Sequence, residues 1–220
     1  RRAGAAAEPL ARAARRLLRS SAPMRTLLAA VTDAALGYLH WQAQRPVDPG
    51  PGAVAPRPPL QRALADARPL SRDGFTLRPL AHFEAEARVL GRQDYGFDTE
   101  SALSPTDLAL GWGRMSDANV LAGLEIRQGG RWYHYSWRSA EPPIPLPEII
   151  RSSANMHFIP ASDEAADALA AVREGQVVRF RGLLVEASRA DGWHWRSSLS
   201  RDDSGGGACE LVWLERIEAR

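Results

Sequence analysis

The sequence predicts an α+β fold that is mainly β. We expect an antiparallel curled sheet or a small, partly open, OB-like barrel with one principal helix, preceded by an N-terminal helix and a Pro-rich linker. Three observations indicate this. Residues 1–70 contain 11 Arg and 4 acidic residues, whereas residues 71–220 contain 17 Arg and 22 acidic residues. Most aromatic residues lie in the second part, and that part shows strand-type alternation separated by turn signals.

These shifts in composition divide the chain into four segments. Residues 1–25 form a basic segment, 26–41 an apolar segment, 42–72 a Pro-rich linker and 73–220 a globular, β-rich domain. About 150 residues in the last segment are enough for one buried core.

The basic segment has two interpretations. Its Arg residues could lie on an amphipathic helix at an anionic surface. Alternatively, Met24 is the natural start and the residues before it are an upstream extension. We favour the second, because Met24 and Arg25 followed by an apolar run are typical of a signal sequence.

The apolar segment favours an uncleaved signal anchor over a soluble helix. Residues 27–39 are 13 residues long, which suits a signal sequence but falls short of the ~20 residues that span a bilayer. Asp33 at its centre costs about 2.5–3.5 kcal/mol, which roughly cancels the gain from its Leu and Val residues. We therefore expect marginal insertion in an inner membrane, with the globular domain in the periplasm; a cytoplasmic location is the alternative.

Prolines define the linker. Residues 45–59 contain six of them, which remove backbone donors and favour extended polyproline conformations. The sequence therefore predicts a semi-rigid spacer.

The first half of the globular domain shows a strand, a helix and a hairpin. Apolar and charged residues alternate over 83–89, which indicates a half-buried strand. Ser104, Pro105 and Asp107 are typical of a helix start, so we expect a short helix that stops at Gly111. Residues 120–127 and 131–138 flank a Gly-Gly turn and predict a β-hairpin.

The second half shows a strand, one longer helix and a meander. Several prolines between 142 and 147 predict a rigid connection, and 155–159 a short strand. A helix opens at Ser162 with two acidic residues in its first turn and ends at Gly175. Three strands complete the chain, over residues 177–187, 193–200 and 209–217.

Charge and cysteine content exclude some classes of function. The pI near 9.1 suggests a nucleic-acid partner, but the positive charge lies outside the globular domain. An acidic domain repels a phosphate backbone, so we expect no nucleic-acid partner. Cys209 is the only cysteine, which excludes an intrachain disulfide and a Cys-based zinc cluster.

The densest aromatic segment is 131–138. On a strand, Tyr133, Tyr135 and Trp137 share one face, and Trp132 and His134 share the other. Such a face could stack single-stranded nucleic acid. We favour packing in the core, because the domain is acidic.

Catalytic and metal signatures are weak. The histidines lack ligand spacing, so we predict no metal site and no cofactor. Ser198 lacks a nucleophile elbow, and Cys209 begins an apolar strand, where cysteine usually packs in the core. No catalytic residue is assigned.

Several stretches resemble an uncharacterised bacterial envelope-protein family. They are residues 103–113, 153–157, 195–201 and 208–210. The resemblance covers about Trp41 to Ile217. It implies a short N-terminal hydrophobic segment before a C-terminal globular domain and an envelope location, and it implies no activity. Asp33 departs from this pattern, because it is an acidic residue within the apolar segment.

We therefore expect a membrane-tethered, non-catalytic binding or assembly domain that faces the periplasm and contacts the membrane and an envelope protein partner. One alternative is a hydrolase that uses His157 with Ser198 or Cys209. Another is an OB-type binder of single-stranded nucleic acid. The candidate binding residues are Asn155, His157, Arg196, Ser198 and Cys209.

Overall fold

A computed structural model describes residues 31–32, 37–38 and 45–220. The chain forms two compact units, residues 1–45 and 46–220, and the second contains all the strands that are described. Residues 31–32 and 37–38 are helical, and most of the predicted apolar segment 26–41 lies outside the described residues. Among the described helices, none has the length and apolar character needed to cross a bilayer.

Ten strands and four short α-helices, with one 3₁₀ helix, make up the described part of residues 46–220. The strands are β1 (Leu60–Ala63), β2 (Leu70–Arg72), β3 (Phe75–Asp94), β4 (Thr106–Gly111), β5 (Glu125–Gly129), β6 (Trp132–Ser136), β7 (Ser153–Pro160), β8 (Val177–Ser188), β9 (His194–Arg196) and β10 (Glu210–Ala219). The helices are α2 (Thr99–Leu103), η1 (Gly113–Ser116), α3 (Ala118–Leu121), α4 (Leu146–Arg151) and α5 (Asp163–Ala170).

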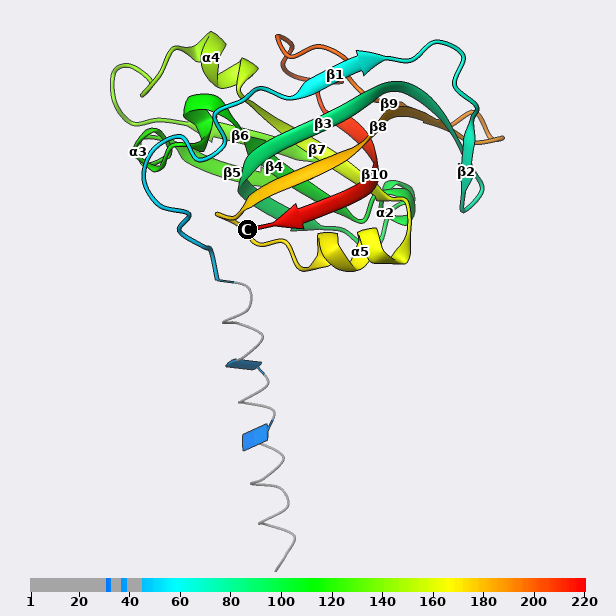
Figure 1. Ribbon diagram of the computed structural model, residues 1–220, viewed down its shortest axis with the longest axis horizontal. Helices are drawn as coiled ribbons and strands as arrows, with labels where there is room; N and C mark the ends of the chain where they lie inside the picture. Colours follow the sequence, from blue (N-terminus) through cyan, green and yellow to red (C-terminus); the bar gives the residue numbers. More distant parts are fainter. Residues whose placement is uncertain (1–30, 33–36, 39–44) are drawn as a thin grey trace, which may run out of the picture. The chain divides into compact units, whose positions relative to one another are not determined.

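Five of these strands close into a barrel (Figure 1). Hydrogen bonds run from β3 through β4, β7, β10 and β8 and return to β3. Every pair in the ring is antiparallel except β7 and β10, which are parallel. Taken in chain order, this is the strand arrangement of an OB-type Greek-key barrel. The predicted mainly β, OB-like fold with one principal helix is therefore confirmed, with one parallel pair and a closed ring.

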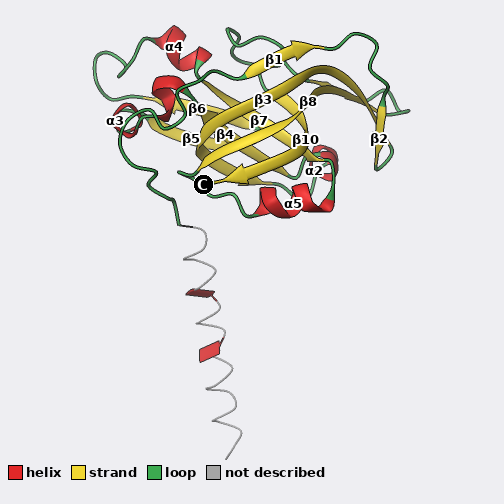
Figure 2. Ribbon diagram, in the orientation of Figure 1, coloured by secondary structure: helices red, strands yellow, loops and turns green. Residues whose placement is uncertain are grey.

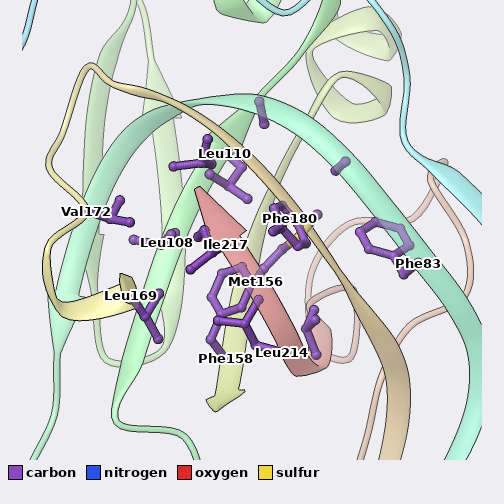
Figure 3. Close-up of a cluster of buried hydrophobic side chains, with 14 of the residues drawn as sticks. Phe83, Leu108, Leu110, Met156, Phe158, Leu169, Val172, Phe180, Leu214 and Ile217 are labelled. Atoms are coloured by element: carbon purple, nitrogen blue, oxygen red, sulfur yellow. The ribbon is translucent and has the colours of Figure 1, made fainter. Parts of the chain in front are cut away.

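The core fills the barrel and is sealed at one end by α5 (Figures 2 and 3). Because side chains alternate along a strand, Leu108 and Leu110 of β4 meet Met156 and Phe158 of β7 inside the ring. From α5, Leu169 joins the same cluster (Figure 3). Ser162 caps this helix, as the sequence predicts, by accepting a hydrogen bond from the amide of Ala165.

The 20-residue strand β3 gives the barrel its curvature. It pairs with β8 through residues 76–88 and with β4 through residues 88–94, so one strand serves both neighbours. Register shifts occur near Pro79 and near Leu90, where an extra residue bends the strand. The strand predicted at 83–89 is the middle of this longer strand.

Between β4 and β7 the chain makes an excursion over the outside of the barrel. This excursion contains η1, α3, α4 and the predicted hairpin, now bounded as β5 and β6. Tyr133 and Tyr135 face a second apolar cluster outside the ring, and Trp132 and His134 are exposed. The sequence favoured packing for the face of the hairpin that carries Tyr133 and Tyr135, and this face packs against the apolar cluster.

The helix predicted at 104–111 is wrong, because residues 106–111 form β4. The cap-like Ser104 instead follows a preceding helix, α2, which starts after Asp98. Leu108 and Leu110 alternate with Asp107 and Ala109, and this places two leucines in the barrel core. Pairing with β3 and β7 therefore overrides the local helix-start signal.

Residues 46–72 of the segment predicted as a semi-rigid, Pro-rich linker belong to the folded unit. Strands β1 and β2 both pair with β3, and the whole unit begins at Pro46. Ala55 is fully buried, and its amide donates to the hydroxyl of Ser116 at 3.1 Å. The amide of Val47 donates to the carbonyl of Glu174 at 2.8 Å. The prolines therefore support an extended path along the barrel.

Candidate binding site

The outer face of β4 and β7 carries a cluster of polar side chains. Asp107 of β4 and His157 of β7 are register partners. Their neighbours Leu108 and Phe158 enter the barrel core, so Asp107 and His157 lie on the outer face. Asn155 lies on the same face, two residues earlier on β7. All three polar residues are almost completely buried by the elements that cover this face.

Asp107 is the centre of this cluster. Its Oδ1 lies 2.9 Å from Nη1 of Arg131 and 2.8 Å from Nδ1 of His157. The histidine contact has the length of an ion pair but not the alignment of a hydrogen bond. Nδ2 of Asn155 donates to Oδ2 at 3.3 Å. A carboxylate that is 0% exposed needs such partners, because burial without them costs several kcal/mol.

Arg131 reaches this carboxylate from the tip of the β5–β6 hairpin. Gly130 and Arg131 have φ values of 58° and 70°, as a type I′ turn requires. An Arg in this left-handed region is uncommon, and its contacts hold it there. Its guanidinium donates to the carbonyl of Ser104 at 2.8 Å and stacks 3.8 Å from the ring centroid of Tyr95. Arg131 therefore ties the hairpin to the loop between β3 and β4.

A cleft of about 420 Å³ opens beside this cluster. His157 lies in its wall, with its ring centroid 4.6 Å from that of Trp195. The cleft lies over β7 and the start of β10 and is bordered by the loop between β8 and β10, which is the surface that OB-type barrels use for ligands. Its lining residues are Glu100, Arg131, Trp132, His157, Trp193, His194, Trp195, Arg196, Gly205, Gly207 and Cys209.

Strand β9 forms one border of the cleft and has an open edge. Within the described residues it pairs with β8 alone. Backbone hydrogen bonds at Trp193 and Ser197, of 2.9 and 3.0 Å, join this segment to β8. Because such bonds alternate along an antiparallel strand, Trp195 also faces β8, and the backbone groups of His194 and Arg196 point outward.

Three of the five candidate residues predicted from the sequence gather at one place. Asn155 and His157 contact Asp107, and Cys209 lines the same cleft as His157. Sγ of Cys209 lies 4.0 Å from the carbonyl oxygen of Arg131.

The other two candidates lie further out. Arg196 lines the rim of the cleft and pairs with Glu186 at 3.0 Å. The hydroxyl of Ser198 donates to Asp203 at 2.6 Å, within the loop between β9 and β10. In the part of the chain that is described, no hydrogen bond joins His157 to either Ser198 or Cys209.

Cys209 is a protonated thiol at neutral pH. Burial raises its pKa to about 12, and the neighbouring carboxylates of Glu210 and Asp107 act in the same direction. A thiolate is the nucleophilic form of cysteine, so this environment works against covalent catalysis.

The sequence did not identify Asp107 and Arg131 as site residues. Asp107 was assigned to a helix start, and Arg131 to the first position of the hairpin strand predicted at 131–138. The alternation of Leu108 and Leu110 with smaller residues was the signal for a strand. The pairing of that strand with β7, which places Asp107 opposite His157, is known from the structure alone.

No group of three or more His, Cys, Asp or Glu side chains is arranged to hold a metal ion among the residues with described positions. The buried cations and carboxylates here pair with each other.

Comparisons with protein-family models, with curated proteins and with solved structures gave no match to this chain. The resemblance to an envelope-protein family therefore stays a prediction.

Proposed function

We propose that this protein is a non-catalytic binding domain that holds an extended segment of a partner protein. The segment would add to the open edge of β9 and place alternate side chains in the cleft. The observation that carries this proposal is that one edge of β9, which no described strand pairs with, lies directly beside an aromatic-lined cleft.

The open edge of β9 can recognise the backbone of a peptide through oriented hydrogen bonds. The outward backbone groups of His194 and Arg196 can donate to and accept from a peptide backbone, as in other cases of strand addition. Trp132, Trp193 and Trp195 line the cleft and offer apolar surface for side chains of the peptide. The segment that fits is therefore extended and carries apolar or aromatic residues.

Charge in the cleft argues for a protein partner over a phosphate backbone. The cation of Arg131 pairs with Asp107 and Asp98, and that of Arg196 pairs with Glu186. Nucleic-acid grooves rely on cations that are free to contact phosphates. The aromatic cleft on the OB ligand face supports the nucleic-acid alternative, and these paired cations count against it.

The hydrolase alternative has less support. The pKa of about 12 at Cys209 keeps the thiol protonated, and the hydroxyl of Ser198 is engaged by Asp203. Within the described residues, neither group has the aligned imidazole that activates a nucleophile.

The proposal includes a membrane tether through residues 26–41, with the domain in the periplasm and an envelope protein as the partner. Its support is the order of basic segment, apolar segment and proline-rich segment in the sequence.

Selection of a displayed library of random peptides on the full-length protein tests the binding proposal. We expect enriched peptides to be rich in β-branched and aromatic residues. His194→Pro removes one outward backbone donor, whereas His194→Ala removes the side chain and keeps the donor. Peptide affinity should fall about tenfold in the Pro variant and little in the Ala variant.

Two results would overturn the proposal. One is a selection without any specific peptide, or with peptides that bind both variants equally. The other is salt-dependent binding of single-stranded oligonucleotides by the full-length protein, which would replace the peptide with a nucleic acid as the ligand.

A further inference from the structure

A second cavity, which we call the pocket, lies next to the cleft and has a volume of about 100 Å³. One water needs roughly 10–15 Å³, so the pocket has room for a small molecule. Aromatic walls come from Trp112 and from Tyr133 and Tyr135 of β6, and polar groups come from Arg201 and Glu210. This site goes beyond the proposed function, because it needs neither the edge of β9 nor a peptide.

Arg201, which is partly buried, and Glu210, which is almost completely buried, form a hydrogen-bonded pair at the pocket. Glu210 is the first residue of β10 and is 1% exposed. Nη1 of Arg201 donates to its Oε1, and the guanidinium lies 5.5 Å from the ring centroid of Phe83. The loop that carries Arg201 is closed by the amide of Ser198, which donates to the carbonyl of Cys209 at 3.0 Å. The backbone therefore fixes the position of the pair.

Several buried polar atoms of the pocket have no hydrogen-bond partner among the residues that the structure describes. They are Nε and Nη2 of Arg201, Oε2 of Glu210 and the hydroxyl of Tyr133. These are four of the eight such side-chain atoms in the described part of the chain. A buried polar atom without a partner costs about 1–3 kcal/mol, so four such atoms beside one cavity favour the binding of a polar group there.

The unpartnered atoms of Arg201 are the two on one edge of its guanidinium. Nε–H and Nη2–H point the same way and match the two oxygens of a carboxylate. Burial raises the pKa of Glu210 to about 8, so this side chain is mostly protonated at pH 7. Its Oε2 can then donate a hydrogen bond, as can the hydroxyl of Tyr133. The four unpartnered atoms together form a set of donors.

We propose that the pocket binds the carboxylate of a small aromatic monocarboxylate, with the carboxylate on the free edge of Arg201 and the ring against Trp112 and Tyr135. The ligand supplies acceptors to the unpartnered donors and a counter-charge to Arg201. Asp203 also lines the pocket, and its carboxylate accepts the hydroxyl proton of Ser198, which limits its repulsion of the ligand.

Benzoate and benzamide are matched probes for this site, because they have the same shape and differ in charge. Binding to the full-length protein is measured by titration of the tryptophan indole NMR signals. We expect benzoate to bind at least about tenfold more tightly than benzamide, because only benzoate satisfies both donors of the Arg201 edge with charged acceptors.

Arg201→Lys keeps the positive charge and removes the planar fork, so the preference for benzoate should disappear. Arg216→Lys is the control, since Arg216 lies on the same sheet and pairs with Glu218 at the surface. If Arg201→Lys fails to fold, Tyr133→Phe removes one donor without changing shape and should weaken benzoate binding by a smaller factor.

Binding of N-acetylphenylalanine distinguishes two sources of the carboxylate, the C-terminus of a polypeptide and a free small molecule. Tighter binding than benzoate would indicate the C-terminus of a polypeptide, and weaker binding a free small molecule. The proposal is overturned if benzamide binds as well as benzoate to the wild-type protein, or if neither probe shifts the indole signals and the pocket holds water alone. Failure here leaves the peptide proposal intact, because its test uses His194 variants.

Discussion

Arg131 at the tip of the β5–β6 hairpin forms an ion pair with Asp107, a fully buried carboxylate on the outer face of β4, with 2.9 Å between Nη1 and Oδ1. The pair joins the excursion between β4 and β7 to the barrel. It also holds Asp107 against His157, which lines the cleft. The geometry of the site therefore depends on a contact between residues that are 24 positions apart in the chain.

Loss of this ion pair should destabilise the protein strongly. Asp107→Ala leaves the buried guanidinium of Arg131 without its main partner, and we expect the free energy of unfolding to fall by about 3–5 kcal/mol in urea denaturation. The free energy of unfolding should fall less in the double variant Asp107→Ala, Arg131→Met than the sum of the decreases in the two single variants, because no buried charge is left unpaired.

Glu125→Ala serves as the control for that experiment. Glu125 pairs with Arg138, whose side chain is 90% exposed, and surface pairs contribute about 1 kcal/mol or less. An equal decrease in the free energy of unfolding in Asp107→Ala and Glu125→Ala would contradict the assignment of Asp107 as the centre of a buried polar cluster.

Protonation of Glu210 should make stability depend on pH. Burial raises its pKa from an ordinary value of about 4.5 to about 8 in the folded protein. Between these two pH values the folded protein keeps the proton and the unfolded chain has released it. Stability is therefore full below about pH 4.5 for this group and falls as pH rises towards 8. The charged groups that face Glu210 are Arg201 and Asp203.

Glu210→Gln should remove this dependence, since an amide has no proton to release. The measurement is Tm by calorimetry from pH 5 to pH 8, where the wild type should decline and Glu210→Gln should be flatter. Glu215→Gln, an exposed change on the same strand, should leave the wild-type slope. A slope that is the same in Glu210→Gln and the wild type would show that another group causes it.

The fold was largely predictable from the sequence because its signals are local. The alternation at Phe83, Ala85 and Ala87 and the capping by Ser162 both survive in the structure. The strand at Thr106–Gly111 was missed because its cap-like residues resemble a helix start, and only pairing with β3 and β7 decides otherwise.

The site was less predictable because its contacts are between distant residues. His157 and Asn155 were selected from a distinctive stretch of sequence, but their partner Asp107 depends on the register of β4 against β7. Arg201 and Glu210 are nine residues apart, and the loop between them brings their side chains together. The number of residues between Arg201 and Glu210 does not show that the loop brings their side chains together.

Cys209 should react slowly in the folded protein. Its pKa of about 12, raised mainly by burial, leaves few thiolates at pH 8, whereas an exposed cysteine has a pKa of about 8.5. We expect reaction with a disulfide reagent to be at least about 100-fold slower in buffer than in denaturant. Cys209 is the only cysteine in the sequence, so the measured rate of thiol reaction belongs to this residue alone. Equal rates would show that the thiol is exposed and ionised in the folded state.

Gly182 allows the close approach of β8 and β10. A β-carbon at this position would lie 2.0 Å from the carbonyl oxygen of Trp213, which belongs to the backbone and cannot rotate away. Gly182→Ala should therefore force the two strands apart and destabilise the protein by about 1–3 kcal/mol or more in urea denaturation. Gly206→Ala is the matched control, because its nearest contact is a side-chain atom of Trp132 at 4.0 Å. A barrel that accepts both changes equally would mean that β8 and β10 are further apart at this point than the hydrogen bonds between them indicate.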